Sequence, residues 1–478
     1  MMRFSLLVLF FLISLLTFSQ SATYQYLKLD SIDVSVPDYP IVVGNIMLEG
    51  NKVTVDRIIF RELEFASGDS MSNQQFVLLL KLSRQNLLNR SLFNFVDMEV
   101  MRNIDNPIIQ DVTIKVVERW YIWPLPIFEL ADRNFNIWWQ TKDFSKVNYG
   151  IYITHNNFRG RNEKLKLLLR AGYNQNYNIS YEMPYITKRQ NLGIGFQIGK
   201  SRSREIPYAT VFDQQLYYKN EEGYAVKEFF VKFMFTFRPG IHDLHNLVFS
   251  YEDYLFADSV LVLNPDFNPT TKSEMFTLTY IFKHDYRDSK PYPLDGYYFD
   301  AEFTKRGLGY FETSPDFFFV KTTFDFYKPI FNRFYWASSL TSKFSSAGYQ
   351  PYFLLHGLGY GNDFVRSYEL YVIDGQDFGL LKNNLKFCIL KPKNGTLPLI
   401  KTERFNKIHY ALYANLLFDA GFVNNDYKGA TTRLQNEFVY GLGIGLDLVT
   451  YYDVVWRIEY SVNQNKMGGF FMHFMAPI

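Results

Sequence analysis

Alternation of apolar and polar side chains over short segments runs through much of this chain and restricts its fold more than any other feature. Residues 276–282 alternate in this way, and residues 320–328 place Lys321, Thr323 and Asp325 on one side. Because neighbouring side chains of a strand point to opposite faces, the pattern predicts strands with one apolar and one polar face. Many such strands predict either a transmembrane β-barrel or a large soluble β-protein.

Composition favours the transmembrane barrel. Aromatic residues make up 19% of the chain, with 36 Tyr and 47 Phe, although the mean hydropathy is only −0.14. Transmembrane barrels combine aromatic girdles with a polar lumen and therefore have this profile. No segment offers the ~18 consecutive apolar residues that a membrane-spanning helix needs. A net charge of +2 indicates neither a nucleic-acid partner nor an acidic tail. The single cysteine, Cys388, excludes an internal disulfide framework.

The N-terminus has the pattern of a secretory signal peptide. Arg3 precedes an apolar run over residues 4–18, and small residues follow at Ser19 and Ala22. We therefore predict that residues 1–22 are a signal peptide. An exported chain with amphipathic strands is typical of the outer membrane of a diderm bacterium, and the lipid bilayer is its first expected partner.

A small domain is predicted between the signal region and the strands. It follows a short N-terminal segment, residues 23–37, and covers residues 38–119, where Thr54 is placed to cap the first of two helices. The apolar periodicity predicts the order β-α-α-β-β, which is long enough for a soluble domain with its own core. The expected elements are strands at 41–49, 93–101 and 108–118 and helices at 54–62 and 72–89.

From residue 120 to residue 478 the pattern indicates strands and connections alone. Sixteen strands fit this length, with about 22 residues for each strand and its connection. The predicted fold is thus mainly β: a sixteen-stranded antiparallel transmembrane β-barrel preceded by one small β-α-α-β-β periplasmic domain. An even number of strands makes residues 347–378 the sixth outer loop. The strands are expected near Tyr149, Leu168, Ile179, Gly195, Leu216, Phe233, Phe249, Leu278, Phe299, Phe324, Leu340, Leu385, Ala414, Gly443, Trp456 and Met472.

Four short motifs occur in order along the predicted barrel. They are Asn-Asn-Phe-Arg-Gly at 156–160, Asp-Tyr-Arg-Asp…Gly at 285–296, Val-Arg-Ser-Tyr-Glu at 365–369 and Phe-Asp-Ala-Gly at 418–421. Together they resemble the turn after the first barrel strand, a periplasmic turn, the sixth loop and the end of strand thirteen in the BamA/TamA-type outer-membrane protein assembly and translocation superfamily. The resemblance covers nearly the whole mature chain, and the small domain resembles one POTRA (polypeptide-transport-associated) repeat.

The resemblance implies that the sixth loop folds back into the barrel. A charge in a partly enclosed lumen loses hydration and must be paired, and the planar guanidinium of Arg suits a carboxylate. Alignment of the motifs makes Asp419 the expected partner of Arg366. The loop motif consists of Val365, Arg366, Ser367, Tyr368 and Glu369.

Two positions depart from the family pattern. Ser367 stands where the family often has Gly, and Lys386 stands near a position where it has an acidic residue. Since Lys386 cannot pair with Arg366, two arrangements are open. Either Asp419 carries the contact alone, or Glu369 and Lys386 form a second pair.

The motif at 285–296 is expected to have a structural role. Asp and Arg side chains can cap backbone groups in a turn, and Gly and Pro fix its conformation. The residues expected to brace the turn after strand eight are Asp285, Arg287, Asp288 and Gly296.

Strand sixteen begins at Gly468 and Gly469. Paired glycines weaken a strand, and family members are thought to open between their first and last strands so that a client strand can pair with the exposed edge. The glycines therefore mark a candidate seam, or alternatively relieve crowding at a barrel turn.

Signals for enzymatic chemistry are weak. His242 and His245 lie in a turn without a placed third ligand, so a polar turn is favoured over a metal site. The Gly-x-Gly-x-Gly runs at 357–361 and 441–445 do not join a strand to a helix and fail the context of a phosphate loop. No nucleophile elbow or Walker loop occurs, so we predict no cofactor, no metal and no enzymatic activity.

The leading functional hypothesis is an assembly factor that folds and inserts outer-membrane proteins. Its partners would be unfolded client proteins and periplasmic or lipoprotein accessory subunits. The alternatives are a secretion channel that translocates a partner protein and a passive pore. A plug helix of the kind expected for the channel does not fit residues 23–37, and a pore needs no periplasmic docking domain.

Overall fold

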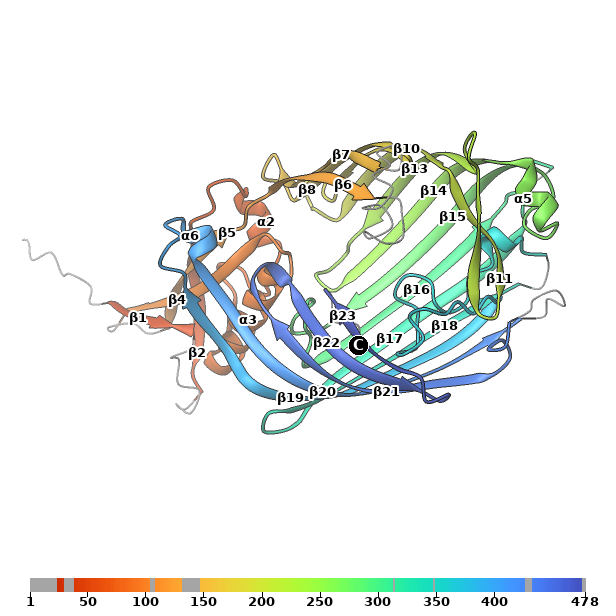
Figure 1. Ribbon diagram of the computed structural model, residues 1–478. Helices are drawn as coiled ribbons and strands as arrows, with labels where there is room; N and C mark the ends of the chain where they lie inside the picture. The colour runs from red at the N-terminus through yellow and green to blue at the C-terminus, as the bar shows by residue number, and fades with distance from the viewer. Residues whose placement is uncertain are drawn as a thin grey trace, which may run out of the picture. The chain divides into compact units, whose positions relative to one another are not determined.

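The computed structural model describes residues 24–29, 38–103, 108–130, 147–312, 314–346, 349–425 and 432–474. They form two compact units, each built around its own sheet (Figure 1). The predicted signal peptide, residues 1–22, lies outside the described residues. None of the helices within the described ranges has both the length and the apolar character to cross a membrane.

The first unit contains a five-stranded sheet in the order β1-β4-β5-β2-β3. The predicted order of elements is present along the chain, and strands β1 and β3 add to it, although residues 52–61 with the first helix belong to the second unit. Helix α3 (Asn73–Leu88) buries Phe76 and Leu80, and the hydroxyl of Ser72 accepts a hydrogen bond of 3.2 Å from the Gln75 N–H at its start. The strands are β1 (Tyr24–Lys28), β2 (Pro40–Glu49), β3 (Ser70–Ser72), β4 (Phe93–Asn103) and β5 (Ile109–Glu118).

The predicted first helix is much shorter than expected, and Thr54 does not cap it. Helix α2 spans Asp56–Phe60, and its N-cap residue is Val55. The Thr54 hydroxyl instead lies 3.1 Å from the Tyr121 hydroxyl and accepts a hydrogen bond of 2.9 Å from the Asn157 side chain. The capping prediction was therefore wrong, because a non-local polar contact takes the hydroxyl.

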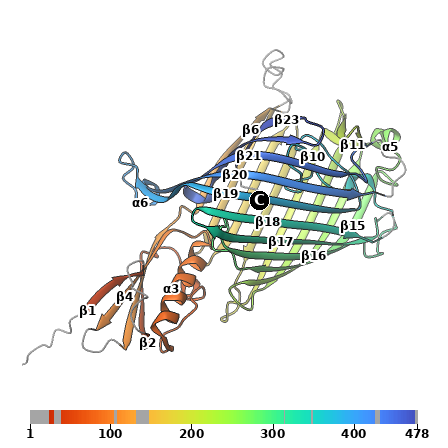
Figure 2. The ribbon, with the colours of Figure 1, turned by 90° about the horizontal axis from the view of Figure 1, so that it is seen from below.

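The second unit carries a sixteen-stranded antiparallel sheet, which confirms the predicted fold class (Figure 2). Its strands follow one another in chain order. They are β6 (Ile122–Leu130), β7 (Val147–Phe158), β8 (Glu163–Gly172), β9 (Gln175–Met183), β10 (Leu192–Ser203), β13 (Val226–Phe237), β14 (Asp243–Phe256), β15 (Lys272–Asp285), β16 (Gly296–Arg306), β17 (Phe317–Phe331), β18 (Phe334–Ser345), β19 (Asp377–Thr396), β20 (Lys407–Asn424), β21 (Phe438–Val449), β22 (Val455–Asn463) and β23 (Gly468–His473). Short helices α5 (Asp258–Leu263) and α6 (Glu403–Asn406) lie in connections.

Two errors in the predicted strand list cancel in the count. The first strand, β6, was missed because Pro124 and Pro126 interrupt its pattern, and proline within a strand is tolerated only at an edge. The strand expected near Leu216 belongs to a separate hairpin of β11 (Glu205–Val211) and β12 (Gln214–Lys219). Residues 156–160 therefore form the end of the second strand and the start of the turn after it, whereas the numbering from Phe233 onward is as predicted.

Strand β22 shows how the sheet divides lipid from lumen. Arg457 and Glu459 are buried, whereas the alternating residues Trp456, Ile458 and Tyr460 are 42–53% exposed. The same alternation puts aromatic side chains on the outer face of other strands. Apolar side chains therefore face outward and charged ones inward, as a transmembrane barrel requires.

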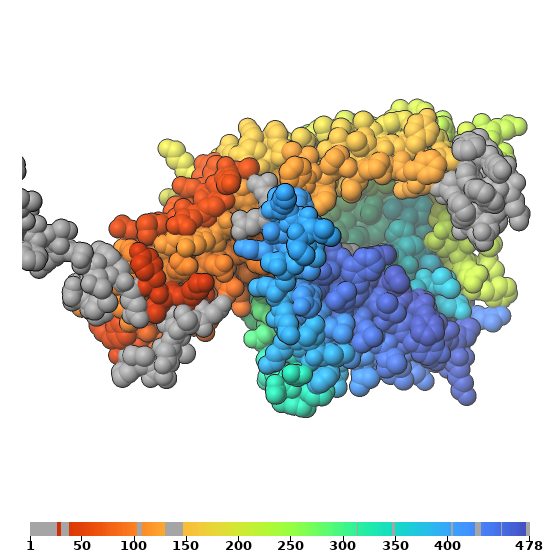
Figure 3. Space-filling view, turned by 60° about the vertical axis from the view of Figure 1, so that its left-hand side comes forward, coloured from red at the N-terminus to blue at the C-terminus, as the bar shows by residue number. Residues whose placement is uncertain are grey.

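The sheet ends at β6 and β23. Within the described part of the chain these two strands pair only with β7 and β22, respectively. Figure 3 shows a recess between the orange segment that contains β6 and the blue C-terminal strands. The barrel wall thus has a lateral seam, and β23, with six residues, is the shortest of the sixteen strands.

Candidate functional site

The sixth loop connects β18 to β19, and its described residues pack against the barrel wall. Val365 and Tyr368 are 1% and 2% exposed. Their neighbours come from the loop itself, from β19 and from the next two strands. The buried cluster consists of Leu358, Val365, Tyr368, Ile373, Phe378, Leu380, Val423, Leu434 and Val439. Burial of this much apolar surface holds the loop in place.

Two glycines of the wall allow the loop to approach closely. A Cβ added at Gly441 would lie 2.1 Å from the carbonyl oxygen of Arg366. One added at Gly421 would lie 2.7 Å from side-chain atoms of Leu358 and Val365. Because contacts this short cannot form, the Gly-x-Gly run at 441–445 has a packing reason.

The structure places Arg366 at the centre of a buried charge cluster. Its guanidinium contacts the Asp419 carboxylate, and its backbone N–H donates to Asp419 Oδ2 at 3.2 Å. Its Nε lies 3.4 Å from Glu459 Oε2. All three side chains are 0–1% exposed, so the charges depend on one another for stabilisation. Glu459 was not predicted, since no local spacing connects it to the loop motif.

Ser367 adopts a left-handed backbone conformation with φ of 66°. Glycine is favoured at such a position, which explains why the family often has Gly there. In this chain the Ser367 hydroxyl donates to the Met467 carbonyl oxygen at 3.0 Å, and its own carbonyl accepts from Asn463 Nδ2 at 3.2 Å. These bonds tie the loop to the connection that leads into β23.

Lys386 does not pair with Glu369, and that alternative was wrong. The strand ladder sets Asp419 opposite Lys382 and Lys386 opposite Asn415, roughly 13 Å further along. Lys386 Nζ instead donates to the Pro293 carbonyl oxygen at 3.4 Å and lies 4.1 Å from the centroid of the Tyr292 ring.

A second buried ion pair lies near Lys386. Arg457 donates to both oxygens of Asp447, at 2.6 and 2.7 Å. The Tyr292 hydroxyl donates to the same carboxylate at 2.8 Å. Tyr292 belongs to the turn between β15 and β16, so this turn reaches lumen-facing side chains of the last strands.

That turn is braced by the residues singled out in the sequence. Arg287 donates to both carboxylate oxygens of Asp285 at 2.9 Å. Asp288 Oδ1 accepts from the backbone N–H groups of Ser289 and Leu294, at 2.8 and 3.0 Å, while burial raises the pKa of this carboxyl. Gly296 has φ of 99°. The contacts are those of a structural turn.

The two glycines of the seam begin β23. Gly468 pairs with Val462 and Gly469 with Ser461 in the ladder. A Cβ at Gly468 would lie 2.8 Å from the Tyr460 hydroxyl, so this position is crowded. This contact supports relief of crowding, and weakening of the strand stays a prediction.

His242 lies in the predicted turn, whereas His245 lies in strand β14. His242 Nδ1 lies 2.7 Å from the Asp285 carbonyl oxygen, and His245 Nδ1 lies 2.8 Å from the Tyr280 hydroxyl. In the sixth loop, burial and the nearby charge of Glu459 raise the pKa of Glu369 to about 7.

The barrel with its inward sixth loop defines the class, an outer-membrane β-barrel protein. Within that class, residues 157–378 match the Omp85 superfamily domain. This match confirms the predicted resemblance to BamA/TamA-type proteins. This match supports a role in assembly or translocation at the outer membrane.

Two solved structures that are similar to this chain are distant from it in sequence. BamA from Haemophilus ducreyi lacking POTRA domains 1-3 is 16% identical with a TM-score of 0.49, and the alignment covers 95% of this chain and 88% of that chain. CdiB from Escherichia coli is 13% identical with a TM-score of 0.51, covering 92% and 74%. No curated protein matches this chain.

Proposed function

We propose that this protein is an outer-membrane assembly factor that helps to fold and insert β-barrel or other outer-membrane proteins. The observation that carries the proposal is the lateral seam. The sixteen-stranded sheet ends at β6 and β23, and each has one edge without a strand partner among the described residues. A client strand can add to such an edge through main-chain hydrogen bonds.

The sequence of β6 lowers the cost of keeping the seam unpaired. Unpaired backbone groups in a lipid environment cost several kcal/mol each. Pro124 and Pro126 have no N–H group, and prolines in an edge strand face away from the neighbouring strand. The free edge of β6 therefore has fewer donors to satisfy, and the short β23 has few backbone groups in total.

The buried Arg366 cluster would hold the sixth loop and the neighbouring strands in place while the strands at the seam move. It joins the sixth loop to β20 and β22, and the loop also bonds to the connection that precedes β23. In this mechanism the loop holds the wall next to the seam while a client displaces β23. The site residues act through position and charge, without a chemical step.

Docking of partners is assigned to the N-terminal domain, which we place in the periplasm as a POTRA-like domain of residues 38–119. In its sheet, β1 lies at one edge, beside β4. Unfolded clients or accessory subunits would extend this sheet by strand addition. Translocation of a partner protein is the second candidate. It is disfavoured because residues 24–28 form a strand rather than a plug helix.

Depletion of the protein in its native host, followed by quantitative outer-membrane proteomics, tests the proposal. We expect several β-barrel proteins to fall together while inner-membrane proteins stay constant. Loss of one secreted protein alone would favour the channel, and an unchanged outer membrane would leave a passive pore. Re-expression of wild-type protein is the control, because it must restore the depleted proteins.

A further inference from the structure

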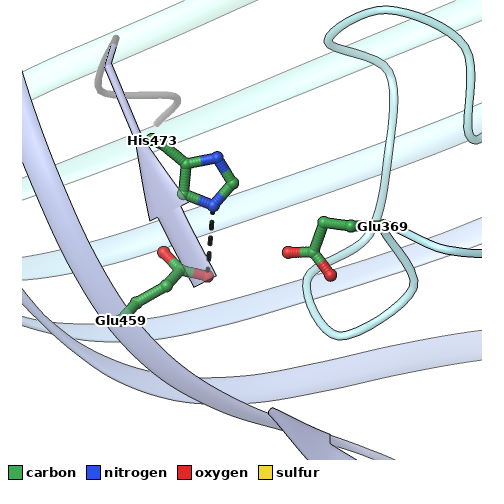
Figure 4. Close-up of side chains that lie close together, drawn as sticks. All are labelled: Glu369, Glu459 and His473. Atoms are coloured by element: carbon green, nitrogen blue, oxygen red, sulfur yellow. Dashed lines mark ion pairs between the residues drawn. The ribbon is translucent and has the colours of Figure 1, made fainter. Parts of the chain in front are cut away.

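Three side chains from separate elements converge beside the Arg366 cluster. Glu369 comes from the sixth loop, Glu459 from β22 and His473 from β23 (Figure 4). A carboxylate oxygen of each Glu and a ring nitrogen of the His all lie within 4.8 Å of one another. The His473 Nε2 to Glu459 Oε1 distance is 3.9 Å, too long for a hydrogen bond.

Four polar atoms of this group are buried and have no hydrogen-bond partner within the described part of the chain. Both carboxylate oxygens of Glu369, Glu459 Oε1 and His473 Nε2 have no hydrogen-bond partner among the residues that the structure describes. The Glu459 side chain is 0% exposed. A buried polar atom without a partner costs about 1–3 kcal/mol, and more if it is charged. Several such atoms facing one another need an explanation.

Among the described residues, no cation contacts the Glu369 carboxyl, although Arg366 and Lys382 both lie near the cluster. Asp419, Glu459 and Glu369 bring three carboxyl groups together, while Arg366 is the cation that contacts the first two. Nearby Lys382 does not form an ion pair with Glu369. Its Nζ donates to the Asn362 carbonyl oxygen at 3.2 Å and lies 4.3 Å from the Phe364 ring centroid. A further positive charge at Glu369 would satisfy the remaining oxygens.

We propose that Glu369, Glu459 and His473 bind a divalent transition-metal ion of the Zn²⁺ class. Two carboxylates and one imidazole are ligands that Zn²⁺ accepts, and water would complete a tetrahedron. The imidazole disfavours Ca²⁺ and Mg²⁺, which prefer oxygen ligands alone. Bonds of about 2.0–2.2 Å require the ligand atoms to approach one another by roughly 1 Å, within the reach of rotamer changes.

The surroundings position the imidazole. The Phe364 ring, from the sixth loop, stacks on His473 with ring centroids 5.9 Å apart and an interplanar angle of 18°. The ion would therefore join the sixth loop to the last two strands, directly at the seam. Bound metal would oppose displacement of β23. Metal binding itself does not depend on the proposed assembly activity.

Metal binding is measured on the purified full-length chain in detergent micelles after treatment with a chelator. Zn²⁺ is titrated by calorimetry, and Co²⁺ is used as a spectroscopic probe because its visible absorption reports tetrahedral coordination. We expect a single ion per chain. Glu369→Gln and His473→Gln should each weaken Zn²⁺ affinity by at least about tenfold, as loss of a ligand or its support commonly does.

The matched control is His242→Gln combined with His245→Gln, which removes two histidines outside the proposed site and should leave Zn²⁺ affinity unchanged. Heat-modifiable electrophoretic mobility verifies that each variant is a folded barrel. Glu369→Gln is the stronger test, since this loop side chain makes no hydrogen bond within the described chain. Equal Zn²⁺ uptake by wild type and both site variants, no uptake by wild type, or preference for Ca²⁺ would each overturn the proposal.

Discussion

Replacing Arg366 by Ala should lower the free energy of unfolding by about 3–5 kcal/mol, because it leaves buried carboxylates without their cation. Asp419 and Glu459 are both 0% exposed, and both contact the guanidinium. Asp419→Ala removes one of the two carboxylates and leaves Arg366 with Glu459. Its effect should therefore be large but smaller than that of Arg366→Ala.

Combining Arg366→Ala with Asp419→Ala distinguishes an ion pair between the two residues from packing of the loop alone. If the two residues stabilise each other, the combined loss is less than the sum of the single losses. The measurement is urea-induced unfolding of the purified barrel, followed by the rate of client assembly in vesicles. Lys272→Ala and Glu274→Ala form the matched control, since this 2.8 Å pair has side chains 52% and 24% exposed and should contribute no more than about 1 kcal/mol. Full additivity at Arg366 and Asp419 would contradict the pairing.

The sequence could predict only those residues of the site that lie in recognisable local motifs. The Arg366 motif and the Asp419 motif each have a recognisable neighbourhood, so their proximity followed from alignment with a family. Glu459 and His473 lie in strands whose lumen-facing positions alternate with apolar ones, and this pattern predicts direction without predicting a partner. Which inward side chains meet depends on strand register and loop docking, which are non-local.

The fold shows the same division between local and non-local information. Alternation identified most barrel strands because lipid and lumen impose opposite chemistry on neighbouring residues. It failed for β6, where Pro124 and Pro126 occupy an edge that needs no donors, and at Leu216, where an amphipathic hairpin lies outside the barrel wall. Both errors arise because alternation does not reveal whether a strand lies inside a sheet, at its edge or outside it.

Locking the seam with a disulfide should abolish assembly of client proteins while leaving the barrel folded. In a Cys388→Ala background, a cysteine at Leu125 in β6 is combined in turn with cysteines at Phe470, Phe471 and Met472 in β23. A disulfide requires Cα atoms about 4.4–6.8 Å apart, so its formation itself reports that the two strands can close. Loss of activity under oxidising conditions and recovery after reduction are the expected results.

The matched control is Tyr280→Cys combined with Phe303→Cys in the same Cys388→Ala background, because these positions face each other in the β15–β16 ladder, away from the seam. This disulfide should form readily and leave client assembly unimpaired.

Replacing Pro124 and Pro126 by Val tests the role of the seam without a cross-link, since it restores two N–H donors at the free edge of β6. This variant should favour strand closure, raise the unfolding midpoint and slow client assembly. Full assembly by the disulfide-locked protein would mean that clients do not enter through the seam, and the unpaired edges would then need another role.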